Sequence, residues 1–188
     1  MQKTIEKNVI IVGTGIHLGR PARLTIKPAP TNHGIVFKGL DVDHNNTLIK
    51  ANFKNILSGE LCTTLVNEEG ISVKTVEHLL AAFSGLGISN ALIEIDNEEI
   101  PILDGSSLKF AQALIDAGIC EQDESLNFCS VKKSIKVVNK NSWVKFEPAD
   151  NLILTVCIDY PNTCIGKQSL SLLISKDTFQ KELCDNRT

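Results

Sequence analysis

The sequence predicts an α+β fold in which a few helices pack on layers of mostly antiparallel strands. Three observations favour this class. Segments rich in valine, isoleucine and threonine, with partial alternation of apolar and polar residues, recur along the chain. One amphipathic stretch, residues 72–90, repeats its apolar residues with the period of a helix. From Phe128 onwards, short strand-like runs separated by polar turns are typical of an antiparallel meander.

Composition narrows the class of protein. A chain of 188 residues, 43% hydrophobic and 22% charged, is typical of a soluble globular protein with one large or two small domains. The net charge of −3 and the lack of a lysine- and arginine-rich run argue against a nucleic-acid partner. No stretch approaches the roughly 20 apolar residues that span a bilayer, and no signal peptide is evident. We therefore expect a cytoplasmic protein whose six cysteines are free thiols.

The first strands are expected at residues 4–12 and 22–27. The loop between them, residues 13–19, carries Gly-x-Gly after a strand and mimics a dinucleotide-binding loop. The third glycine is displaced, because Leu18 occupies its place, and a strand follows where a helix should receive the phosphate. We therefore reject a nicotinamide site. The loop also holds His17, which the residue pattern leaves open as either a functional histidine or an ordinary loop residue.

Further strands follow before and after the amphipathic stretch. A polar turn is expected at residues 41–46, and a strand from Leu61 to Val66 leads towards the central helix. The other expected strands are residues 35–37, a short strand or turn at residues 49–53, and residues 90–95.

The central helix is predicted from Thr75 to about Ser84. Thr75 is suited to cap its start, because a threonine hydroxyl can accept a hydrogen bond from a first-turn amide. Glycines suit the left-handed turn that ends a helix, and Gly85 and Gly87 stand at its end. The apolar face consists of Val76, Leu79, Leu80 and Phe83.

Glu77 and His78 lie in the first turn of this helix. The helix dipole favours a carboxylate there, and a neighbouring imidazole is a metal ligand or a proton carrier. Polar side chains at the start of an otherwise apolar helix need a reason. The residues alone allow a capping glutamate beside a partly exposed histidine as well as a functional pair.

A second helix is predicted at residues 108–117, with Gly118 ending it. Asp104 and Gly105 form a turn before it, and Ser106 or Ser107 caps it. A catalytic role for Asp104 is the alternative, and the turn is the favoured interpretation.

The remaining chain is predicted to begin with a polar linker, residues 120–124. A final helix is expected at residues 175–184, with Ser175 as its cap and Phe179 and Leu183 on one face. The strands between them are expected at residues 131–138, 143–147, 152–160 and 169–174.

Three segments resemble one known family. The stretch from Thr75 to Asn90 closely resembles the motif of the zinc-dependent UDP-3-O-acyl-N-acetylglucosamine deacetylases of lipid A synthesis. The Gly-x-Gly-x-His-x-Gly loop and the segment Glu99-Ile-Pro-Ile-Leu-Asp-Gly-Ser-Ser are similar to further segments of that family. The resemblance implies that Glu77 is the general base and that His78 is a ligand of one zinc ion.

The same resemblance implies other site residues. Leu61 and Cys62 match a segment that lines the entrance for the acyl-sugar, although the residues alone also fit an ordinary buried strand. Tyr160 keeps an aromatic side chain that would lie near the nucleotide or diphosphate. His17 would lie near the active-site passage in a supporting role, and Thr188 near the oxyanion.

Two departures from the family concern the second half of the chain. Asn162 and Thr163 stand where the family usually has a histidine and a proline. The final Arg187-Thr188 matches the start of the family's Arg-Thr-Phe motif. The family's other zinc ligands, a histidine and an aspartate, come later, as do a lysine and a histidine that stabilise the oxyanion and the leaving group. Of the zinc ligands, this chain therefore supplies His78 alone, and the carboxy-terminal part of the family is expected to be missing.

The family fold is two related two-layer α/β sandwich domains with the active site between them. Residues 1–120 would form the first domain, and residues 126–188 the amino-terminal part of an incomplete second domain. The implied function is zinc-dependent hydrolysis of the N-acetyl group of UDP-3-O-acyl-N-acetylglucosamine, which releases acetate early in lipid A synthesis. The alternative is a catalytically inactive truncated or split-gene fragment, or a non-catalytic UDP-sugar-binding module. The expected partners are the acylated UDP-amino sugar and a complementing carboxy-terminal fragment.

Overall fold

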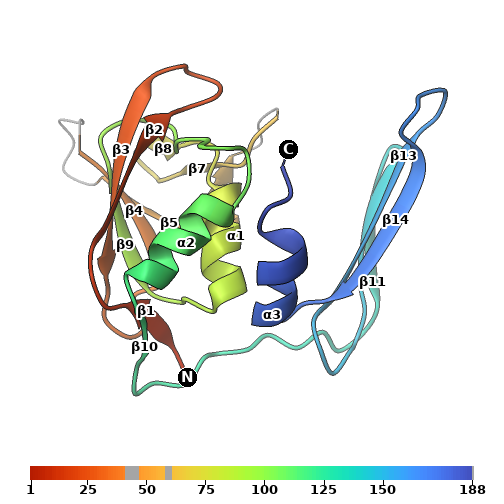
Figure 1. The fold of residues 1–188 in the computed structure, drawn as a ribbon. Helices are drawn as coiled ribbons and strands as arrows, with labels where there is room; N and C mark the ends of the chain where they lie inside the picture. Colours follow the sequence, from red (N-terminus) through yellow and green to blue (C-terminus); the bar gives the residue numbers. More distant parts are fainter. Residues whose placement is uncertain (41–46, 58–60, 188) are drawn as a thin grey trace.

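The computed structural model describes residues 1–40, 47–57 and 61–187 (Figure 1). Its largest sheet has five strands in the order β2-β3-β9-β4-β5. Neighbouring strands pair antiparallel, except β4 and β9, which are parallel. The predicted α+β class is therefore confirmed, and this mixed sheet is not a doubly wound parallel one. Its strands are β2 (Val9–Thr14), β3 (Pro21–Pro28), β9 (Ala91–Ile95), β4 (Ile35–Gly39) and β5 (Leu48–Lys50).

One face of this sheet forms the core. Alternate residues of a strand point to opposite faces, and Leu24 and Ile26 of β3 are fully buried beside Ile93 and Ile95 of β9. The helices α1 and α2 lie on this face (Figure 1). The opposite face carries exposed residues such as Arg23. The sheet therefore holds the two helices on one side only.

Two smaller sheets complete this part of the chain. β1 (Lys3–Ile5) pairs antiparallel with β10 (Ile119–Glu121). The linker expected at residues 120–124 is therefore wrong for its first residues, because they add a strand to the amino terminus. The strand expected at residues 4–12 is interrupted after Ile5 and resumes as β2. The other sheet joins β6 (Ile56–Leu57), β7 (Thr64–Val66) and β8 (Ser72–Val73), after the 3-10 turn η1 (Phe53–Asn55).

The central helix α1 (Glu77–Leu86) buries the predicted apolar face, with Leu79 and Phe83 almost inaccessible to solvent. It ends as expected at Gly87, whose φ of 74° is left-handed and whose N–H donates to the carbonyls of Phe83 and Ser84. Its start differs from the prediction. Thr75 does not cap the helix, because its hydroxyl donates to the Glu99 carboxylate 24 residues further on.

The second helix α2 (Leu108–Asp116) buries Phe110, Ala111 and Leu114 and is followed by Gly118 at a φ of 81°. Of the two serines considered as caps, Ser106 accepts a hydrogen bond from the Leu108 N–H at 3.1 Å. Asp104 accepts hydrogen bonds from the N–H and the hydroxyl of Ser106. The turn interpretation of Asp104 is therefore confirmed.

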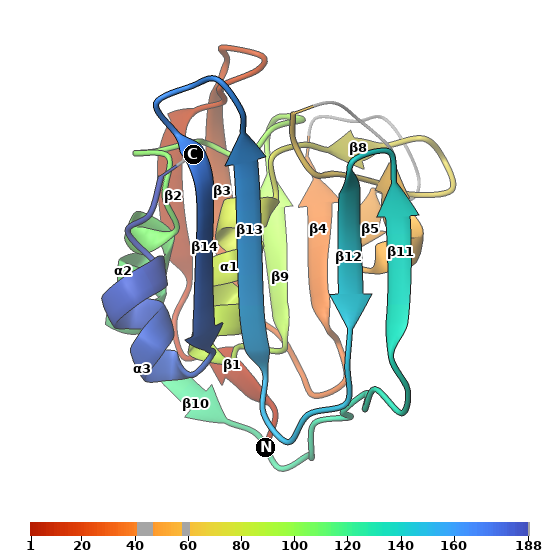
Figure 2. The ribbon, with the colours of Figure 1, turned by 90° about the vertical axis from the view of Figure 1, so that its right-hand side faces the viewer.

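Two hairpins follow, and they lie side by side in one layer (Figure 2). Within the described ranges, strand pairing in this region occurs only inside each hairpin, and each is antiparallel as predicted. The chain then turns back as the short helix α3 and the π-helical segment η2, which lie beside α1 and α2 at the β14 edge of this layer (Figure 1 and Figure 2). The bounds are β11 (Ile135–Asn139), β12 (Ser142–Phe146), β13 (Ile153–Tyr160), β14 (Gly166–Leu173), α3 (Lys176–Thr178) and η2 (Phe179–Leu183).

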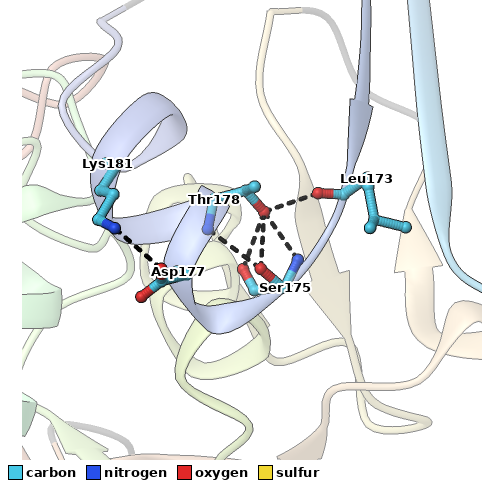
Figure 3. A network of polar contacts seen from close by, with 5 residues as sticks. All are labelled: Leu173, Ser175, Asp177, Thr178 and Lys181. Atoms are coloured by element: carbon cyan, nitrogen blue, oxygen red, sulfur yellow. Dashed lines mark hydrogen bonds and ion pairs between the residues drawn. The ribbon is translucent and has the colours of Figure 1, made fainter.

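Ser175 caps α3, as predicted from the sequence. Its hydroxyl oxygen accepts a hydrogen bond from the Thr178 N–H at 3.1 Å, and the Thr178 hydroxyl donates to the Leu173 carbonyl at 2.7 Å (Figure 3). Lys181 pairs with Asp177 one turn before it. Local hydrogen bonds therefore fix the turn between β14 and the final helical segment.

One face of the β13–β14 hairpin is apolar and exposed. Leu154 pairs with Leu172 and Val156 with Leu170, so that these side chains share a face. Val156 is 49% exposed and Leu170 is 56% exposed. The opposite face is more polar, and it includes the hydrogen-bonded pair Thr155 and Ser171. An apolar face of this kind is normally a contact surface.

The final helical segment is anchored on α1 and on the turn before α2. The Phe179 ring is buried against Gly85, where a Cβ atom would collide with the ring. Gly85 therefore does not end the helix, as the sequence suggested, but provides the space for this contact. Ser107 donates a hydrogen bond to the Cys184 carbonyl at 3.1 Å. These contacts hold residues 179–187 beside the start of α2.

We expect Gly85→Ala to displace this segment and expose the Cys184 thiol. The added methyl group meets the Phe179 ring, and overpacking of this kind costs about 1–3 kcal/mol. The rate of thiol labelling at Cys184, followed by mass spectrometry, should then rise about 5- to 100-fold. Cys184 is an informative reporter because it is 3% exposed and burial raises its pKa.

The matched control is Ser84→Ala, an exposed position on the same helix, which should leave labelling of Cys184 unchanged. The exposed Cys157 and Cys164 serve as internal references. Unchanged labelling of Cys184 in Gly85→Ala would show that Phe179 does not depend on this contact.

Candidate functional site

A cavity of about 440 Å³ lies between α1 and the final helical segment. Glu77 and His78 line it from the first turn of α1. The opposite wall is largely apolar. The other lining residues are Ala81, Ser84, Gly85, Ser107, Leu152, Leu154, Ile174, Phe179, Leu183 and Asn186.

Glu77 is oriented by a neighbouring segment. Its Oε2 accepts a hydrogen bond from the Thr63 N–H at 3.1 Å, and the Val76 N–H donates to the Thr63 carbonyl at 3.4 Å. His78 follows directly and is half-buried on the same cavity. A carboxylate held by a main-chain amide next to an imidazole is an arrangement suited to proton transfer or metal binding.

Leu61 and Cys62 directly precede Thr63, so that they lie beside the start of α1. Leu61 is 90% exposed and has a φ of 67°, and Cys62 is half-buried with its thiol 3.7 Å from the Thr64 hydroxyl. The strand expected from Leu61 begins only at Thr64. The strand predicted from Leu61 to Val66 is therefore wrong for Leu61 and Cys62, which precede β7.

The loop that contains His17 closes over a buried carboxylate. Glu99 is 1% exposed and accepts hydrogen bonds from the N–H groups of His17 at 2.9 Å and Leu18 at 2.7 Å. It also accepts one from the Thr75 hydroxyl at 3.1 Å. The loop resembles a phosphate-binding loop because its amides do hold an anion, but that anion belongs to the protein. This contact explains why the motif is not a dinucleotide site.

These hydrogen bonds lower the pKa of Glu99. Burial by itself raises the pKa, and the donors from His17, Leu18 and Thr75 outweigh it because they favour the charged form. A carboxyl group with a lowered pKa in the folded state stabilises the fold above its unfolded pKa. That contribution is lost as the pH falls through the folded pKa.

We therefore expect the difference in unfolding free energy between the wild type and Glu99→Gln to be constant near neutral pH and to shrink in acid. The ionised carboxylate is the source of the difference, so the two proteins should converge once Glu99 is protonated. Urea unfolding midpoints measured from pH 7 to pH 3 provide the test. A difference that grows in acid would contradict the lowered pKa.

Tyr160, a further candidate residue, does not line this cavity. Tyr160 is 52% exposed at the end of β13, where its carbonyl accepts hydrogen bonds from the N–H and hydroxyl of Thr163, and it is not among the lining residues. Thr188 lies outside the described residues.

The described residues do not complete a zinc site. Across residues 1–40, 47–57 and 61–187, no group of three histidine, cysteine, aspartate or glutamate side chains is placed to hold a metal ion. A catalytic zinc normally has three protein ligands, and His78 alone does not meet that requirement. In the same part of the chain, no helix has the length and apolar character needed to cross a membrane.

A larger cavity of about 780 Å³ lies elsewhere, lined by residues that include Arg20, Asp96 and Glu98. Its lining contains none of the site residues singled out from the sequence, and it includes Leu40, which directly precedes the undescribed residues 41–46. The smaller cavity at Glu77 and His78 is therefore the candidate site.

Sequence reasoning missed two residues of this region. The sequence pattern predicts Thr63 only as part of a strand, although its amide orients Glu77. Glu99 appears in the sequence-based prediction only within a segment that resembles the family. One signal could have identified Glu99, because it begins the otherwise apolar run Glu99-Ile-Pro-Ile. A charged residue that is buried next to such a run requires hydrogen-bond partners.

Comparisons with known proteins agree with the resemblance in the sequence. The family model described as LpxC, UDP-3-O-acyl N-acetylglycosamine deacetylase, matches residues 2–188. The UDP-3-O-acyl-N-acetylglucosamine deacetylase of Idiomarina loihiensis is 39% identical over 189 residues, which cover 100% of this chain and 61% of that relative. The proteins of the same name from Histophilus somni and Pasteurella multocida are each 38% identical, over 100% of this chain and 62% of the relative. The chain thus spans about three fifths of the length of these curated relatives.

Proposed function

The chain belongs to the UDP-3-O-acyl-N-acetylglucosamine deacetylase family, and from that premise we propose that Glu77 and His78 form part of a deacetylase active site. The reaction is hydrolysis of the N-acetyl group of UDP-3-O-acyl-N-acetylglucosamine, with release of acetate. One observation carries the proposal: the two residues that match the family's base and ligand lie next to each other on a cavity.

The chemical role of Glu77 follows from its geometry. Amide hydrolysis needs a group that takes a proton from the attacking water, and a carboxylate on the cavity wall is suited to do so. The Thr63 N–H holds one carboxylate oxygen and fixes the orientation of the group. As the C–N bond breaks, the proton held by Glu77 can pass to the departing amine. Acetate and the free amino sugar are the products.

His78 is proposed as one ligand of zinc, a Lewis acid that lowers the pKa of bound water in enzymes of this kind. The remaining ligands would come from the part of the relatives that this chain does not span. The described residues do not by themselves supply a complete ligand set for a metal ion.

The substrate contacts stay part of the proposal. Leu61 and Cys62 are supported by their position next to Thr63 and Glu77. His17 is supported by the hydrogen bond that ties its loop through Glu99 to Thr75. Tyr160 and Thr188 are carried by the family resemblance alone.

The division into domains is also proposed, with residues 1–120 and 126–188 as the two parts. The last strand of the first part, β10, pairs with its first strand, β1, so that both ends of this part lie in one sheet. This pairing supports the division. A cytoplasmic location is supported by the six free cysteines, as expected in a reducing compartment. A complementing carboxy-terminal fragment stays a prediction.

The test measures acetate release from UDP-3-O-acyl-N-acetylglucosamine by an extended protein, in which residues 1–188 are continued to the full length of the relatives. The proposal requires turnover that depends on zinc and on Glu77. An extended protein that folds, binds zinc and releases no acetate would refute it.

A further inference from the structure

We propose that the buried Glu99 is a positioning residue that holds the His17 loop and the segment before Glu77 in one fixed arrangement. The hydrogen bonds of Glu99 are present whatever reaction the protein catalyses. Only the suggested benefit, a fixed position of the His17 loop relative to Glu77, rests on the proposed function.

Glu99 is buried, and its carboxylate therefore requires hydrogen-bond partners. An ionised carboxylate that is 1% exposed is costly to bury unless hydrogen bonds satisfy it. Both oxygens are used, because Oε1 accepts from the His17 N–H and the Thr75 hydroxyl, and Oε2 accepts from the Leu18 N–H. The donors come from two segments that are far apart in the sequence. One side chain therefore links the loop after β2 to the start of α1.

The Thr75 backbone needs such a link. Its φ of 59° is left-handed, a backbone conformation that is strained for a β-branched residue. Main-chain hydrogen bonds hold the preceding residue, because the Lys74 N–H donates to Glu98 and the Lys74 carbonyl accepts from Ile100. The hydroxyl of Thr75 then bonds to Glu99. The strained residue lies two positions before Glu77, so that it determines the direction in which α1 begins.

The His17 loop is fitted to the same carboxylate. The Gly15 N–H donates to the Arg20 carbonyl at 3.0 Å and the Gly19 N–H to the Gly15 carbonyl at 3.2 Å, which closes the loop on itself. A Cβ atom at Gly15 would collide with the Glu99 carboxylate. The loop thus packs directly on Glu99, and the position of His17 is set through its own main chain.

Amide hydrogen exchange in the 188-residue chain tests the proposal directly. In Glu99→Gln, an NH₂ group replaces one accepting oxygen and the charge is lost. Hydrogen bonds to charged groups are strong enough that the protection of the His17 and Leu18 amides should fall about 10- to 100-fold. The control is Glu98→Gln, an exposed neighbour, which should leave both amides unchanged. Unchanged protection in a folded Glu99→Gln protein would overturn the proposal.

A second variant decides the question if Glu99→Gln does not fold. Thr75→Val removes the hydroxyl donor and keeps the β-branched shape. We expect faster exchange at the Val76 and Thr63 amides, which lie at the start of α1, with the His17 and Leu18 amides protected within about twofold of the wild type. No change at Val76 and Thr63 would show that Glu99 does not position the helix start.

The extended protein separates positioning from simple folding. Glu99→Gln should lower kcat for acetate release while KM and zinc content stay near the wild-type values, and Glu99→Asp, which keeps the charge, should restore part of kcat. Equal losses of kcat and zinc in both variants would indicate a merely structural role and overturn the positioning role. If the wild-type extended protein releases no acetate, the proposed function fails, and the exchange experiment still decides the role of Glu99.

Discussion

Replacing Glu77 by glutamine in the extended protein is expected to lower kcat for acetate release by about 10²–10⁴-fold, the usual contribution of a general base. Glutamine has nearly the same shape, and its amide oxygen can still accept the hydrogen bond from the Thr63 N–H. It cannot accept a proton from water at neutral pH. The change therefore removes the proposed chemistry with little effect on the surrounding structure.

The measurement is acetate release at saturating substrate, together with the zinc content of each protein. Zinc content should be unchanged in Glu77→Gln, because the proposed ligand is His78. Glu98→Gln makes the same change of charge at an exposed position away from the cavity and should keep full activity. Near-normal turnover by Glu77→Gln would remove Glu77 from the role of base.

Periodicity in the sequence predicted the elements that build the core. The apolar residues of α1 and α2 recur with a helical period, and both helices bury those residues. Alternation likewise predicted β3 and β9, which lie side by side at the centre of the sheet. These predictions hold because the spacing of apolar residues within a single helix or strand determines which of its faces is buried.

The errors arise where a distant residue decides the local structure. Thr75 has the chemistry of a cap, but its hydroxyl donates to Glu99, which the local pattern could not reveal. The residues from Cys120 look like a linker, yet they pair with β1 at the other end of the chain. The sequence pattern predicts Gly85 as a helix terminator, whereas in the structure it leaves the space in which the Phe179 ring packs. Each case depends on a tertiary contact.

The candidate site shows the same division. Glu77 and His78 could be identified from adjacent residues in one motif, and the structure places both on a cavity. The amide of Thr63 and the carboxylate of Glu99 act on the start of α1 from other segments. Sequence reasoning therefore reached the residues proposed for the chemistry and missed those that hold them in place.

The last prediction concerns the 188-residue chain by itself. We expect it neither to bind zinc tightly nor to release acetate from the acylated UDP-sugar. His78 is the only residue matched to the family's zinc ligands, and the described part of the chain contains no group of three metal-binding side chains. Since an open catalytic zinc site needs three protein ligands, one histidine leaves the metal weakly held.

The measurement compares zinc affinity and acetate release for residues 1–188 and for the extended protein, each with and without His78→Ala. The substitution should lower the zinc content of the extended protein and leave that of the shorter chain unchanged. Because thiolates are zinc ligands, the exposed thiols, such as that of Cys129, are blocked before metal is added. Robust acetate release by residues 1–188 that disappears in Glu77→Gln would contradict the prediction. Such a result would mean that the chain obtains its other ligands from elsewhere, for example from a second copy.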